Sequence, residues 1–525
     1  MLVDNGVRGD SRVQKTAVSA AEAGWEVILL GRALKGQPET WKLGEAEVRL
    51  IPVTNGLGRR RHEFRRVFRR GLLAYPPNGI AAHRAQWVKA WKADLKVRQA
   101  ALTLAEKEGA VRGLGVKKLM LRGRMIAATL LGRWVSFRYW QLTSAQRARK
   151  PLSGPIDRLY TWFWLKVMGD RAWRRLEPRL YDFDLAFGPV IDSLKPDIIH
   201  SHDFRMIGIS ARATLRARAA GRAVKLIWDA HEYLPGLNPG NNPVRWLPAI
   251  TAYEREHAPY ADAVVTVSEA LADLLQKEHK LPERPLVVLN APITAQTDKP
   301  EDLVPDVRTQ CGLGPDVPLV AYCGGVAPVR GVNVMIEALP QLPDVHVALV
   351  SLPPGRPTTR FIEELRSLAD QLGVTDRVHI LPYAPHEQVA RVLSTADAAV
   401  SPLIHLPNHQ IALSNKFFEY SHARLPIVVS DVRTMAETVR STGQGEVFRA
   451  QDVNDYIRAV RAVLADPKKY RAAYDQPGLL ERWTWEAQAE VLDKLYQRLL
   501  ADLPGRTTAG ARGSEEPVET SNALV

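Results

Sequence analysis

One segment of the chain, residues 408–431, places a cation, amide donors and a carboxylate at spacings that suit a phosphorylated ligand. A helix is predicted from Lys416 onward, and Ser414 or Asn415 can cap its start. The free N–H groups and dipole of a helix start attract anions, and Lys416 adds a formal charge there. Glu419, one turn later, can accept hydrogen bonds from hydroxyls. These groups predict a site for a phosphorylated sugar such as a nucleotide, and the alternative is a capped helix with solvated side chains.

A glycine-rich turn offers a second set of groups for a phosphate. The apolar run 319–323 is typical of a buried strand, and Gly324 and Gly325 follow it. Arg330 and Gly331 then precede a predicted helix. Glycine lets the backbone approach a phosphate closely, and Arg330 supplies a cation at the helix start. The turn matches neither the dinucleotide fingerprint nor the Walker loop, so by itself it is a weak signal.

Polar side chains follow the predicted strands of the first half. The strands at 196–200 and 224–228 each end in a short run that holds histidine and acidic residues. In an open parallel sheet, ligands bind at the edge formed by the carboxyl ends of the strands. The spacing in the first run provides no third metal ligand, so we expect no metal. The candidates for this cleft are His202, Asp203, His231 and Glu232.

Strands and helices that alternate position these groups. Residues 1–6 form the end of a strand, a helix is expected at 11–24, and strands at 25–30 and 47–53 complete a unit that predicts a parallel sheet. The first strand is short, so we expect the reading frame to begin further upstream. After a polar linker at 293–307, a second α/β series begins. It has strands at 319–323, 345–351, 378–381, 398–400 and 425–429, helices at 332–339, 360–372, 386–395, 416–422 and 452–465, and a terminal helix at 482–500.

Length and composition limit the possible architectures. A chain of 525 residues predicts two or three domains. No apolar run approaches the roughly 20 residues that a membrane span needs, and we expect no signal peptide. The two cysteines, Cys311 and Cys323, match no metal spacing and imply no disulfide framework, which fits a reducing cytoplasm. We therefore expect a cytoplasmic protein.

One segment carries the positive charge. Residues 59–179 hold 29 Lys/Arg and 7 Asp/Glu, so the remainder of the chain has a net charge of −8 although the total is +14. The segment has a helical pattern with Trp and Tyr interleaved. Two functional interpretations stay open: contact with the inner face of an anionic membrane, or nucleic-acid binding, which we do not expect because no known motif is present. The third interpretation is a helical insertion whose aromatic residues pack on the main domain.

Several motifs in order resemble the GT-B glycosyltransferases, and within them the retaining group called family 4. The runs VAYCGGVAPVRGVNVMIEAL at 320–339, VLSTADAAVSPL at 392–403 and SNKFFEYSHARLPIVVSD at 414–431 are similar to that family's donor-binding domain. IIHSHD, DAHEY, VSEALADLL and VLNAP match its N-terminal domain in order. The resemblance implies an α/β fold of two Rossmann-like domains that face each other across a cleft, with a helical basic insertion in the first. We assign residues 1–292 to the acceptor domain, 293–475 to the donor domain, 476–504 to a helix that packs back on the first domain, and 505–525 to a disordered tail.

The resemblance implies roles for individual residues. Glu419 would bind the nucleotide ribose, Arg330 and Lys416 the diphosphate, and His202 the region of the donor sugar, so that His202, Arg330 and Lys416 form the catalytic set. Two positions depart from the family pattern: Ile411 stands eight residues before Glu419, where the family has a second glutamate, and Gly325 stands where many relatives have arginine. The donor site would comprise Gly324, Gly325, Arg330, Ser414, Asn415, Lys416 and Glu419. The loop that faces the phosphates or the acceptor would comprise Gly6, Gly9, Asp10 and Arg12.

The implied reaction moves a sugar from a nucleoside diphosphate sugar to an acceptor with the anomeric configuration retained and with no metal or other cofactor. No carboxylate is placed as an obvious nucleophile. The basic segment would suit a lipid-linked or cell-envelope acceptor. Three alternatives stay open: a GT-B sugar-nucleotide epimerase, a GT-B scaffold with weakened activity, and a basic nucleic-acid-binding protein.

Overall fold

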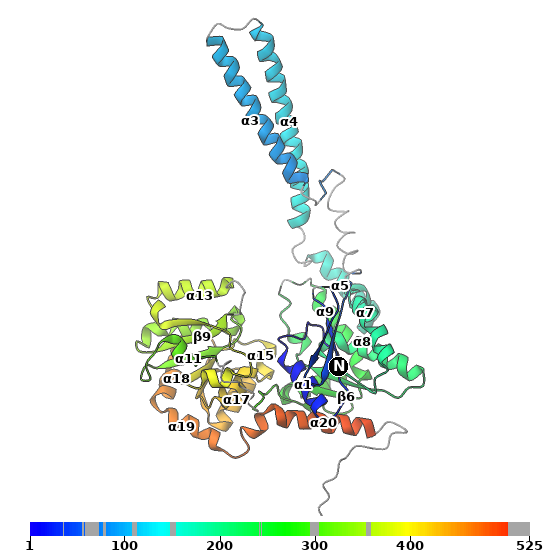
Figure 1. The fold of residues 1–525 in the computed structure, drawn as a ribbon, viewed down its shortest axis with the longest axis vertical. Coiled ribbons are helices and arrows are strands. Elements are labelled where there is room, and N and C mark those ends of the chain that lie inside the picture. Colours follow the sequence, from blue (N-terminus) through cyan, green and yellow to red (C-terminus); the bar gives the residue numbers. More distant parts are fainter. Residues whose placement is uncertain are drawn as a thin grey trace, which may run out of the picture.

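Two α/β domains lie side by side, and a long helical hairpin projects from the first of them (Figure 1). The computed structural model describes residues 1–34, 36–54, 57, 73–76, 80–107, 113–147, 154–240, 242, 244–294, 304–352 and 359–501. The predicted tail at 505–525 and arginines 65, 66, 69 and 70 of the basic segment lie outside the described residues.

The sheet of the first domain is mainly parallel. Its strands are β1 (Ile28–Arg32), β2 (Glu39–Leu43), β3 (Ala46–Ile51), β4 (Ile198–His202), β5 (Lys225–Ala230), β6 (Ala263–Thr266) and β7 (Leu286–Val287). Two groups with the orders β2-β3-β1 and β4-β5-β6-β7 are joined through Leu2, which forms parallel bridges with Leu30 and Ser201. The predicted first strand is thus reduced to an isolated bridge.

Strand β2 was not predicted, and it pairs antiparallel with β3. Leu43 lies opposite Ala46, so only Gly44 and Glu45 form the turn, with Gly44 at a φ of 56°. A two-residue turn that contains a glycine with positive φ is a recognised hairpin signal. The alternating residues of β2 are a further signal, since its odd and even positions differ in exposure.

Helices cover both faces of this sheet. One core contains residues of α7 (Leu180–Leu194) and α8 (Asp203–Ala219) together with β4 and β5. The other contains residues of α1 (Ser11–Glu22) and of the last helix, α20 (Trp485–Ala501). Strands such as β1 and β6 are apolar along their length and polar only at their ends. A parallel sheet of such strands needs helices on both faces to bury its side chains. The helices of the first domain are α1 (Ser11–Glu22), α3 (Ile80–Lys107), α4 (Leu114–Arg147), α5 (Pro155–Met168), α6 (Trp173–Leu176), α7 (Leu180–Leu194), α8 (Asp203–Ala219), α9 (Trp246–His257) and α10 (Glu269–His279).

The second domain has a six-stranded sheet in the order β10-β9-β8-β11-β12-β13, and every pairing in it is parallel. Its strands are β8 (Leu319–Cys323), β9 (His346–Leu352), β10 (Val378–Pro382), β11 (Ala398–Ser401), β12 (Ile427–Ser430) and β13 (Gly445–Phe448). Numbered from β8, this is the order 3-2-1-4-5-6 of a doubly wound Rossmann-type domain. The predicted parallel α/β domain is confirmed, with β13 as an additional edge strand.

The helices of the second domain range from five to 13 residues. They are α11 (Val307–Cys311), α12 (Asn333–Glu337), α13 (Arg360–Gln371), α14 (Val389–Leu393), α15 (Pro407–Ile411), α16 (Asn415–His422), α17 (Arg433–Thr442), α18 (Val453–Ala465) and α19 (Pro467–Arg471). The order of strands reverses between β8 and β11. Ligands bind at such a switch point in open α/β sheets, so α16 and the turn after β8 are well placed for a site.

The chain returns to the first domain through α20 (Trp485–Ala501). Trp485, Leu492 and Tyr496 of this helix are buried in the core that lies against α1. Trp485 N–H donates to Pro292 O at 2.8 Å, and the Leu289 N–H donates to the Gln488 side chain at 2.8 Å. The terminal helix therefore packs on the N-terminal domain, beside the segment where the chain leaves it.

Basic insertion residues form a helical hairpin of α3 and α4, which Figure 1 shows standing well clear of both domains. Helix α5 lies at its base. The helical content expected for this segment is thus found in its described part, but α3 and α4 pack on each other, not on the main domain.

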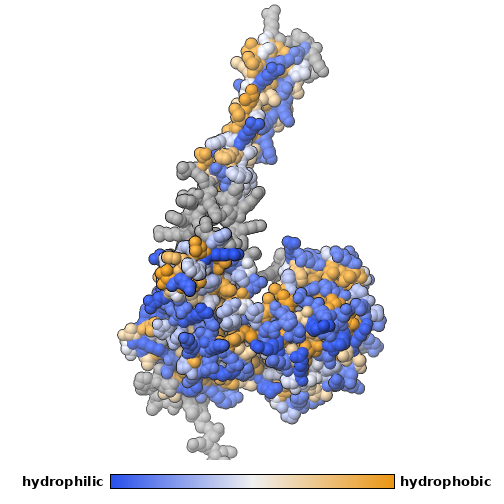
Figure 2. Space-filling model, turned by 180° about the vertical axis from the view of Figure 1, so that it is seen from behind, coloured by the Kyte–Doolittle hydropathy of each residue, from blue (hydrophilic) through white to orange (hydrophobic). Residues whose placement is uncertain are grey.

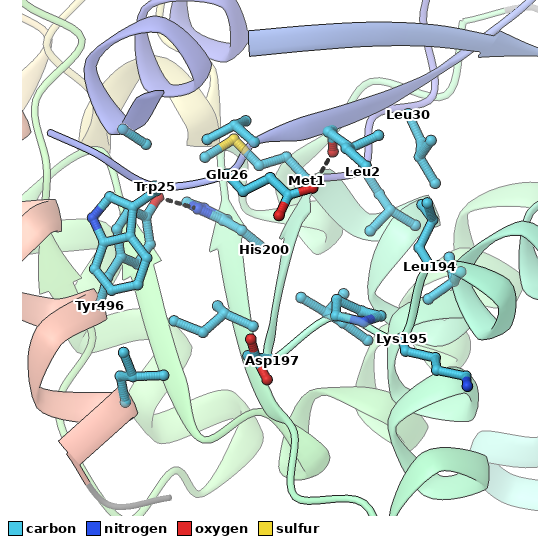
Figure 3. Close-up of a pocket in the computed structure, with 18 of the residues that line it drawn as sticks. Met1, Leu2, Trp25, Glu26, Leu30, Leu194, Lys195, Asp197, His200 and Tyr496 are labelled. Atoms are coloured by element: carbon cyan, nitrogen blue, oxygen red, sulfur yellow. Dashed lines mark hydrogen bonds between the residues drawn. The ribbon is translucent and has the colours of Figure 1, made fainter. Parts of the chain in front are cut away.

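A cavity of about 400 Å³ lies at the amino-terminal ends of β1 and β4, between them and α20 (Figure 3). Tyr496 and His200 line it, and their side chains form a 2.7 Å hydrogen bond. The Met1 ammonium donates to Ile28 O at 2.9 Å, and burial lowers the pKa of this amine to about 5. This cavity is at the sheet edge opposite the polar strand ends, so it is separate from the site described below.

Candidate functional site

The turn after β8 is built around two glycines that the local geometry requires. Gly324 has a φ of 119°, and a Cβ there would lie 2.2 Å from Cε of Lys416. Gly331 has a φ of 69°, and a Cβ there would lie 2.0 Å from the Pro402 carbonyl oxygen, just beyond β11. Any other residue at either position would clash as well as strain the backbone. The two glycines therefore hold the turn against β11 and leave room for the Lys416 side chain.

Lys416, on the first turn of α16, lies directly over this turn. Its Nζ is 5.5 Å from the centre of the Tyr322 ring. Burial lowers the pKa of Lys416, and the nearby Arg330 lowers it further, while Glu419 acts in the opposite direction. Within the described residues, no carboxylate forms an ion pair with the Lys416 ammonium. The side chain is thus a poorly compensated cation at the switch point.

Arg330 brings a second cation to the same place. It lies on a short 3₁₀ turn, Pro328–Arg330, and its charge is felt by both Lys416 and Tyr322. Among the residues that the structure describes, its guanidinium has no hydrogen-bond partner. The predicted pair of cations is therefore close enough to interact electrostatically, and neither forms an ion pair within the described residues. A buried cation whose pKa is lowered further by a second cation is a candidate for a functional site.

Glu419 lies one turn along α16 from Lys416. Burial raises the pKa of its carboxyl to about 6, although Lys416 and Lys15 both pull it down. Lys15 belongs to α1 of the first domain, so the Glu419 carboxylate is within electrostatic reach of the opposite domain. Burial together with Arg12 lowers the pKa of Lys15 itself to about 7. The predicted donor residues therefore face a gap shared by both domains.

The first domain contributes a network around Asp229. His202 Nδ1 is 3.1 Å from Asp229 Oδ2, and His231 Nε2 is 3.2 Å from the same oxygen. Arg12 donates to both carboxylate oxygens at 2.8 and 2.9 Å. Burial acts to raise the pKa of Asp229, but the charges of Arg12 and His231 and the hydrogen bond from His202 keep this pKa well below its usual value. Asp229 is therefore ionised and fixed.

His202 is held by this carboxylate in one tautomer. Burial lowers the pKa of His202, so the ring is neutral at pH 7. Because Asp229 is ionised and can only accept, Nδ1 of His202 carries the hydrogen and Nε2 is left as an acceptor. That Nε2 is buried and has no hydrogen-bond partner in the described part of the chain. It is the ring atom of His202 whose hydrogen-bonding capacity is unused.

Two acidic residues complete this edge of the first domain. Asp203 has a φ of 67°, a left-handed conformation uncommon for a non-glycine residue, at the strand-to-helix turn where α8 begins. Such outliers cluster at functional sites. Burial and the neighbouring Asp203 raise the pKa of Glu232, whereas His231 and Arg330 lower it. Glu232 of the first domain and Arg330 of the second therefore interact electrostatically across the gap.

The predicted loop at the start of the chain differs from expectation in one residue. Gly6 and Gly9 do lie in the turn before α1, and Asp10 caps that helix by accepting from the Val13 N–H at 3.3 Å. Arg12 does not face the gap as expected: it is buried, bound to Asp229 and to the Val288 carbonyl oxygen. A buried arginine needs a carboxylate partner, and Asp229 satisfies that need.

The start of α16 also differs in detail from the sequence interpretation. The helix begins at Asn415, with Ser414 as its N-cap residue, but the Ser414 hydroxyl forms no capping hydrogen bond. The hydroxyl oxygen is buried without a partner among the described residues. Gly325 lies exposed beside Gly324 with open space around it. The Gly325 carbonyl oxygen accepts from the Tyr322 hydroxyl at 2.8 Å, whereas the hydrogen-bonding capacity of the Ser414 hydroxyl is unused within the described residues.

Ile411 has a role that sequence reasoning did not identify. It ends α15, is 4% exposed, and belongs to the hydrophobic core of the first domain although it lies in the second. The Ser268 hydroxyl donates to its carbonyl oxygen, and the Asn408 side chain bonds both the N–H and the carbonyl of Tyr233 at 3.0 and 3.2 Å. We call α15 with these contacts the clasp. It holds the domains together at the position where the family has a glutamate.

His200, His202 and Asp229 offer three ligand atoms within 4.8 Å of one another. The third ligand that the sequence spacing lacked is thus supplied by the neighbouring strand β5. Both oxygens of Asp229 already accept from Arg12, and a cation here would lie beside that guanidinium. The donor set therefore fits a hydrogen-bond network better than a metal centre.

Comparisons with known proteins agree with this geometry. A family model described as "Glycosyltransferase Family 4" matches residues 148–296, and one described as "Glycosyl transferases group 1" matches residues 317–466. Together they cover more than half of the chain, including both sides of the site. The chain belongs to the family 4-like glycosyltransferases of GT-B fold. The hairpin of α3 and α4 lies outside both matched ranges.

Curated relatives of this glycosyltransferase are distant. "D-inositol 3-phosphate glycosyltransferase" of Mycobacterium marinum is 25% identical over 321 residues, covering 60% of this chain and 66% of that protein. The protein of the same name from Mycobacterium sp. (strain KMS) is 27% identical over 273 residues, covering 51% of this chain and 59% of the relative. The matches thus span less than two thirds of these relatives.

Among solved structures, sucrose-phosphate synthase from Thermosynechococcus elongatus matches with a TM-score of 0.57 at 16% identity, covering 93% of both chains. This likeness establishes the GT-B arrangement of two Rossmann-like domains, which confirms the fold expected from the motifs.

Proposed function

We propose that this glycosyltransferase moves a sugar from a nucleoside diphosphate sugar to an acceptor hydroxyl. The observation that carries the proposal is the pair of cations at the switch point of the second domain, Arg330 and Lys416, neither of which forms an ion pair within the described residues. A diphosphate supplies the negative charge that these groups lack. Glu419 on the same helix accepts hydrogen bonds from the ribose hydroxyls.

Catalysis in this proposal is mainly electrostatic. When the bond between the sugar and the diphosphate breaks, negative charge develops on the leaving phosphate oxygen. Arg330 and Lys416 are already in place to stabilise that charge, so no reorganisation is needed at the moment of reaction. Burial around Lys416 strengthens the interaction because water screens it less.

His202 takes a positioning role toward the sugar. Its Nε2 is a hydrogen-bond acceptor fixed by the Asp229 contact on the other ring nitrogen. A sugar hydroxyl that donates to Nε2 would be held in one orientation. Asp203, His231 and Glu232 line the same edge and bound the space for the acceptor.

Retention of configuration is part of the proposal. Glu419 is the carboxylate nearest the predicted phosphate contacts on α16, and its ribose role leaves it unavailable as a nucleophile. The leaving diphosphate oxygen then assists deprotonation of the acceptor on the same face of the sugar. Ile411, in the clasp, stands where the family has its second glutamate, so this position offers no carboxylate to the donor sugar. In the proposal, other groups contact the hydroxyls of that sugar.

The acceptor we propose is a polyol or glycan, lipid-linked or part of the cell envelope. The curated relatives are named for D-inositol 3-phosphate, so this compound belongs in the acceptor panel. Sugar released without any acceptor, or an epimerised nucleotide sugar, would instead identify the epimerase alternative.

A thermal-shift screen with UDP-, GDP-, ADP- and TDP-sugars tests the donor assignment. One nucleotide should raise the Tm, and Arg330→Ala and Lys416→Ala should each weaken its binding while the fold is kept. Arg366→Ala, on the outer helix α13, is the matched control because its guanidinium also lies on the second domain. Unchanged nucleotide affinity in both site variants would refute the assignment. NMR analysis of the anomeric product tests retention.

A further inference from the structure

The α3–α4 hairpin is an antiparallel coiled coil with a narrow buried seam. Its fully buried residues recur every seven positions, which is the repeat that keeps a seam facing its partner helix. Only about one position per heptad is buried on each helix, which leaves most of both helix surfaces uncovered. The seam consists of Ala81, Val88 and Leu95 on α3 and of Leu121, Ala128, Val135 and Leu142 on α4.

Helix α4 carries a second apolar surface that the hairpin does not cover. At 100° per residue, its members fall within about 140° of the helix circumference, roughly 120° away from the seam. Leu119 is 70% exposed and Trp134 is 44% exposed. We call this surface the stripe; it comprises Val116, Leu119, Met120, Ile126, Leu130, Leu131, Trp134 and Phe137.

Aromatic residues extend the stripe toward the body of the protein. The rings of Trp134 and Phe137 stack at 6.0 Å, and those of Phe137 and Trp140 at 6.3 Å. Figure 2 shows apolar surface along the hairpin and again near its base. Helix α5 at that base exposes Leu159, Trp162, Phe163 and Val167. An apolar surface this long on an exposed element marks an interaction site.

The charge around the stripe specifies the kind of partner. Helix α4 has seven Lys/Arg and no acidic residue, and α3 has six Lys/Arg against two acidic residues. Lys118 and Arg122 flank one side of the stripe together with Arg133, and Lys117 and Arg124 lie on the other. Of these, Lys118 is paired with Glu106, and the others form no ion pair within the described residues.

We propose that the stripe of α4 lies in the interface of an anionic lipid bilayer and anchors the enzyme there. A long apolar face of Leu, Ile, Met, Trp and Phe, bordered by Lys and Arg, is a surface that inserts at the level of the lipid headgroups. The basic border pairs with anionic headgroups. At about 1.5 Å per residue, the stripe from Val116 to Phe137 presents roughly 30 Å of this face.

The same charges argue against a second copy of this chain as the partner. Two copies of α4 packed along their stripes would set seven cations against seven, with no acidic residue on either helix to neutralise them. A bilayer crossing is also not supported: no helix in the described ranges is apolar and long enough to span a membrane. The hairpin therefore lies along the surface.

The inference deepens the proposed function and rests on it in one respect: a surface-bound enzyme meets an acceptor that is held in the same membrane. Membrane binding itself does not depend on the transfer reaction. The stripe lies far along the hairpin from the switch point (Figure 1), so the two can be tested separately.

Vesicle flotation of the full chain tests the proposal. We expect binding to phosphatidylcholine vesicles with 30% phosphatidylglycerol, little binding to pure phosphatidylcholine, and loss of binding in 0.5 M NaCl, which screens the headgroup contacts. A variant with Ile126→Ser, Trp134→Ser and Phe137→Ser should bind the anionic vesicles at least 100-fold more weakly. Because all three side chains are exposed, the Tm and the nucleotide-induced Tm shift should be kept.

The matched control is Leu185→Ser with Tyr260→Ser, since these residues are comparably exposed apolar residues on the main domain. The control should bind vesicles as the unchanged protein does. Equal binding by the stripe variant, or no binding by the full chain, would overturn the proposal. If sedimentation shows that the unchanged protein is a dimer and the stripe variant is not, the stripe binds a second copy of the chain. If the protein binds RNA or DNA in a salt-sensitive manner and does not bind vesicles, the stripe binds nucleic acid.

Discussion

Replacing Lys416 by methionine should weaken nucleotide binding strongly while it changes the stability of the fold only slightly. In the folded protein without ligand, burial and the nearby Arg330 oppose the Lys416 charge, as the lowered pKa of this lysine shows. Glu419 and the Tyr322 ring favour it, and a cation–π contact of this kind stabilises by about 0.5–1 kcal/mol. Because these effects oppose each other, we expect Lys416→Met to change the free energy of unfolding by less than about 1 kcal/mol, or about 3 °C in Tm.

Nucleotide binding should respond much more strongly. A hydrogen bond between charged groups contributes about 1.5–3 kcal/mol, so losing the Lys416 contact should raise the Kd for the diphosphate about 10- to 150-fold. Isothermal titration calorimetry with the nucleotide found in the thermal-shift screen measures this change, and urea unfolding measures stability in the same preparation.

The control for this experiment is Lys469→Met. Lys469 Nζ lies 5.1 Å from the centre of the Tyr470 ring, so the variant loses a comparable cation–π contact on α19, away from the switch point. Its nucleotide Kd should be unchanged. The reasoning is refuted if Lys416→Met binds nucleotide normally, or if its Tm falls by far more than that of the control, since Lys416 would then be a structural residue.

Three further changes have expected outcomes. Burial raises the pKa of Glu419 to about 6, so below that pH the protonated carboxyl should accept hydrogen bonds from the ribose hydroxyls less well. Protonated Glu419 stabilises the fold below about pH 4.5, and this stabilisation should be lost as the pH rises through 6. Glu419→Gln should flatten the pH profiles of both nucleotide binding and the free energy of unfolding. Arg12→Met leaves Asp229 buried without its cation and should cost about 3–5 kcal/mol in urea unfolding, whereas weak nucleotide binding by a normally stable variant would restore the phosphate role first expected for Arg12. Ile411→Glu should open the clasp and increase the radius of gyration measured by small-angle scattering; an unchanged radius with tighter donor binding would contradict this.

The elements that the sequence predicted well are those with a strong local pattern. The strand 319–323, its glycine turn and the helix at Lys416 were all found close to their expected positions, because apolar β-branched runs and helix-start signals are local. Strand β2 was missed because three of its five residues are polar and none is fully buried, so the period-2 signal is short and weak. Its two-residue turn with Gly44 was the available clue.

Spacing alone predicted the candidate site only where the residues act within one element, and the pairing of Arg330 with Lys416 came from the family resemblance. Lys416 and Glu419 share α16, so their spacing alone set their relation. Arg12 is different: its partner, Asp229, is 217 residues away, and only the folded sheet brings them together. Ile411 also required the structure, because an isoleucine before a helix gives no sign that it packs into the other domain.

The contact between Trp485 and Pro292 has a mechanical consequence. Two stretches of chain, one leaving the first domain and one returning to it, run next to each other and are joined by the hydrogen bonds of Trp485 and Gln488. A single connection would let the lobes swivel in any direction, whereas a double one favours rotation about an axis through the pair. Opening of the two domains to release product would then begin at the clasp, and the two adjacent chain segments would act as the hinge.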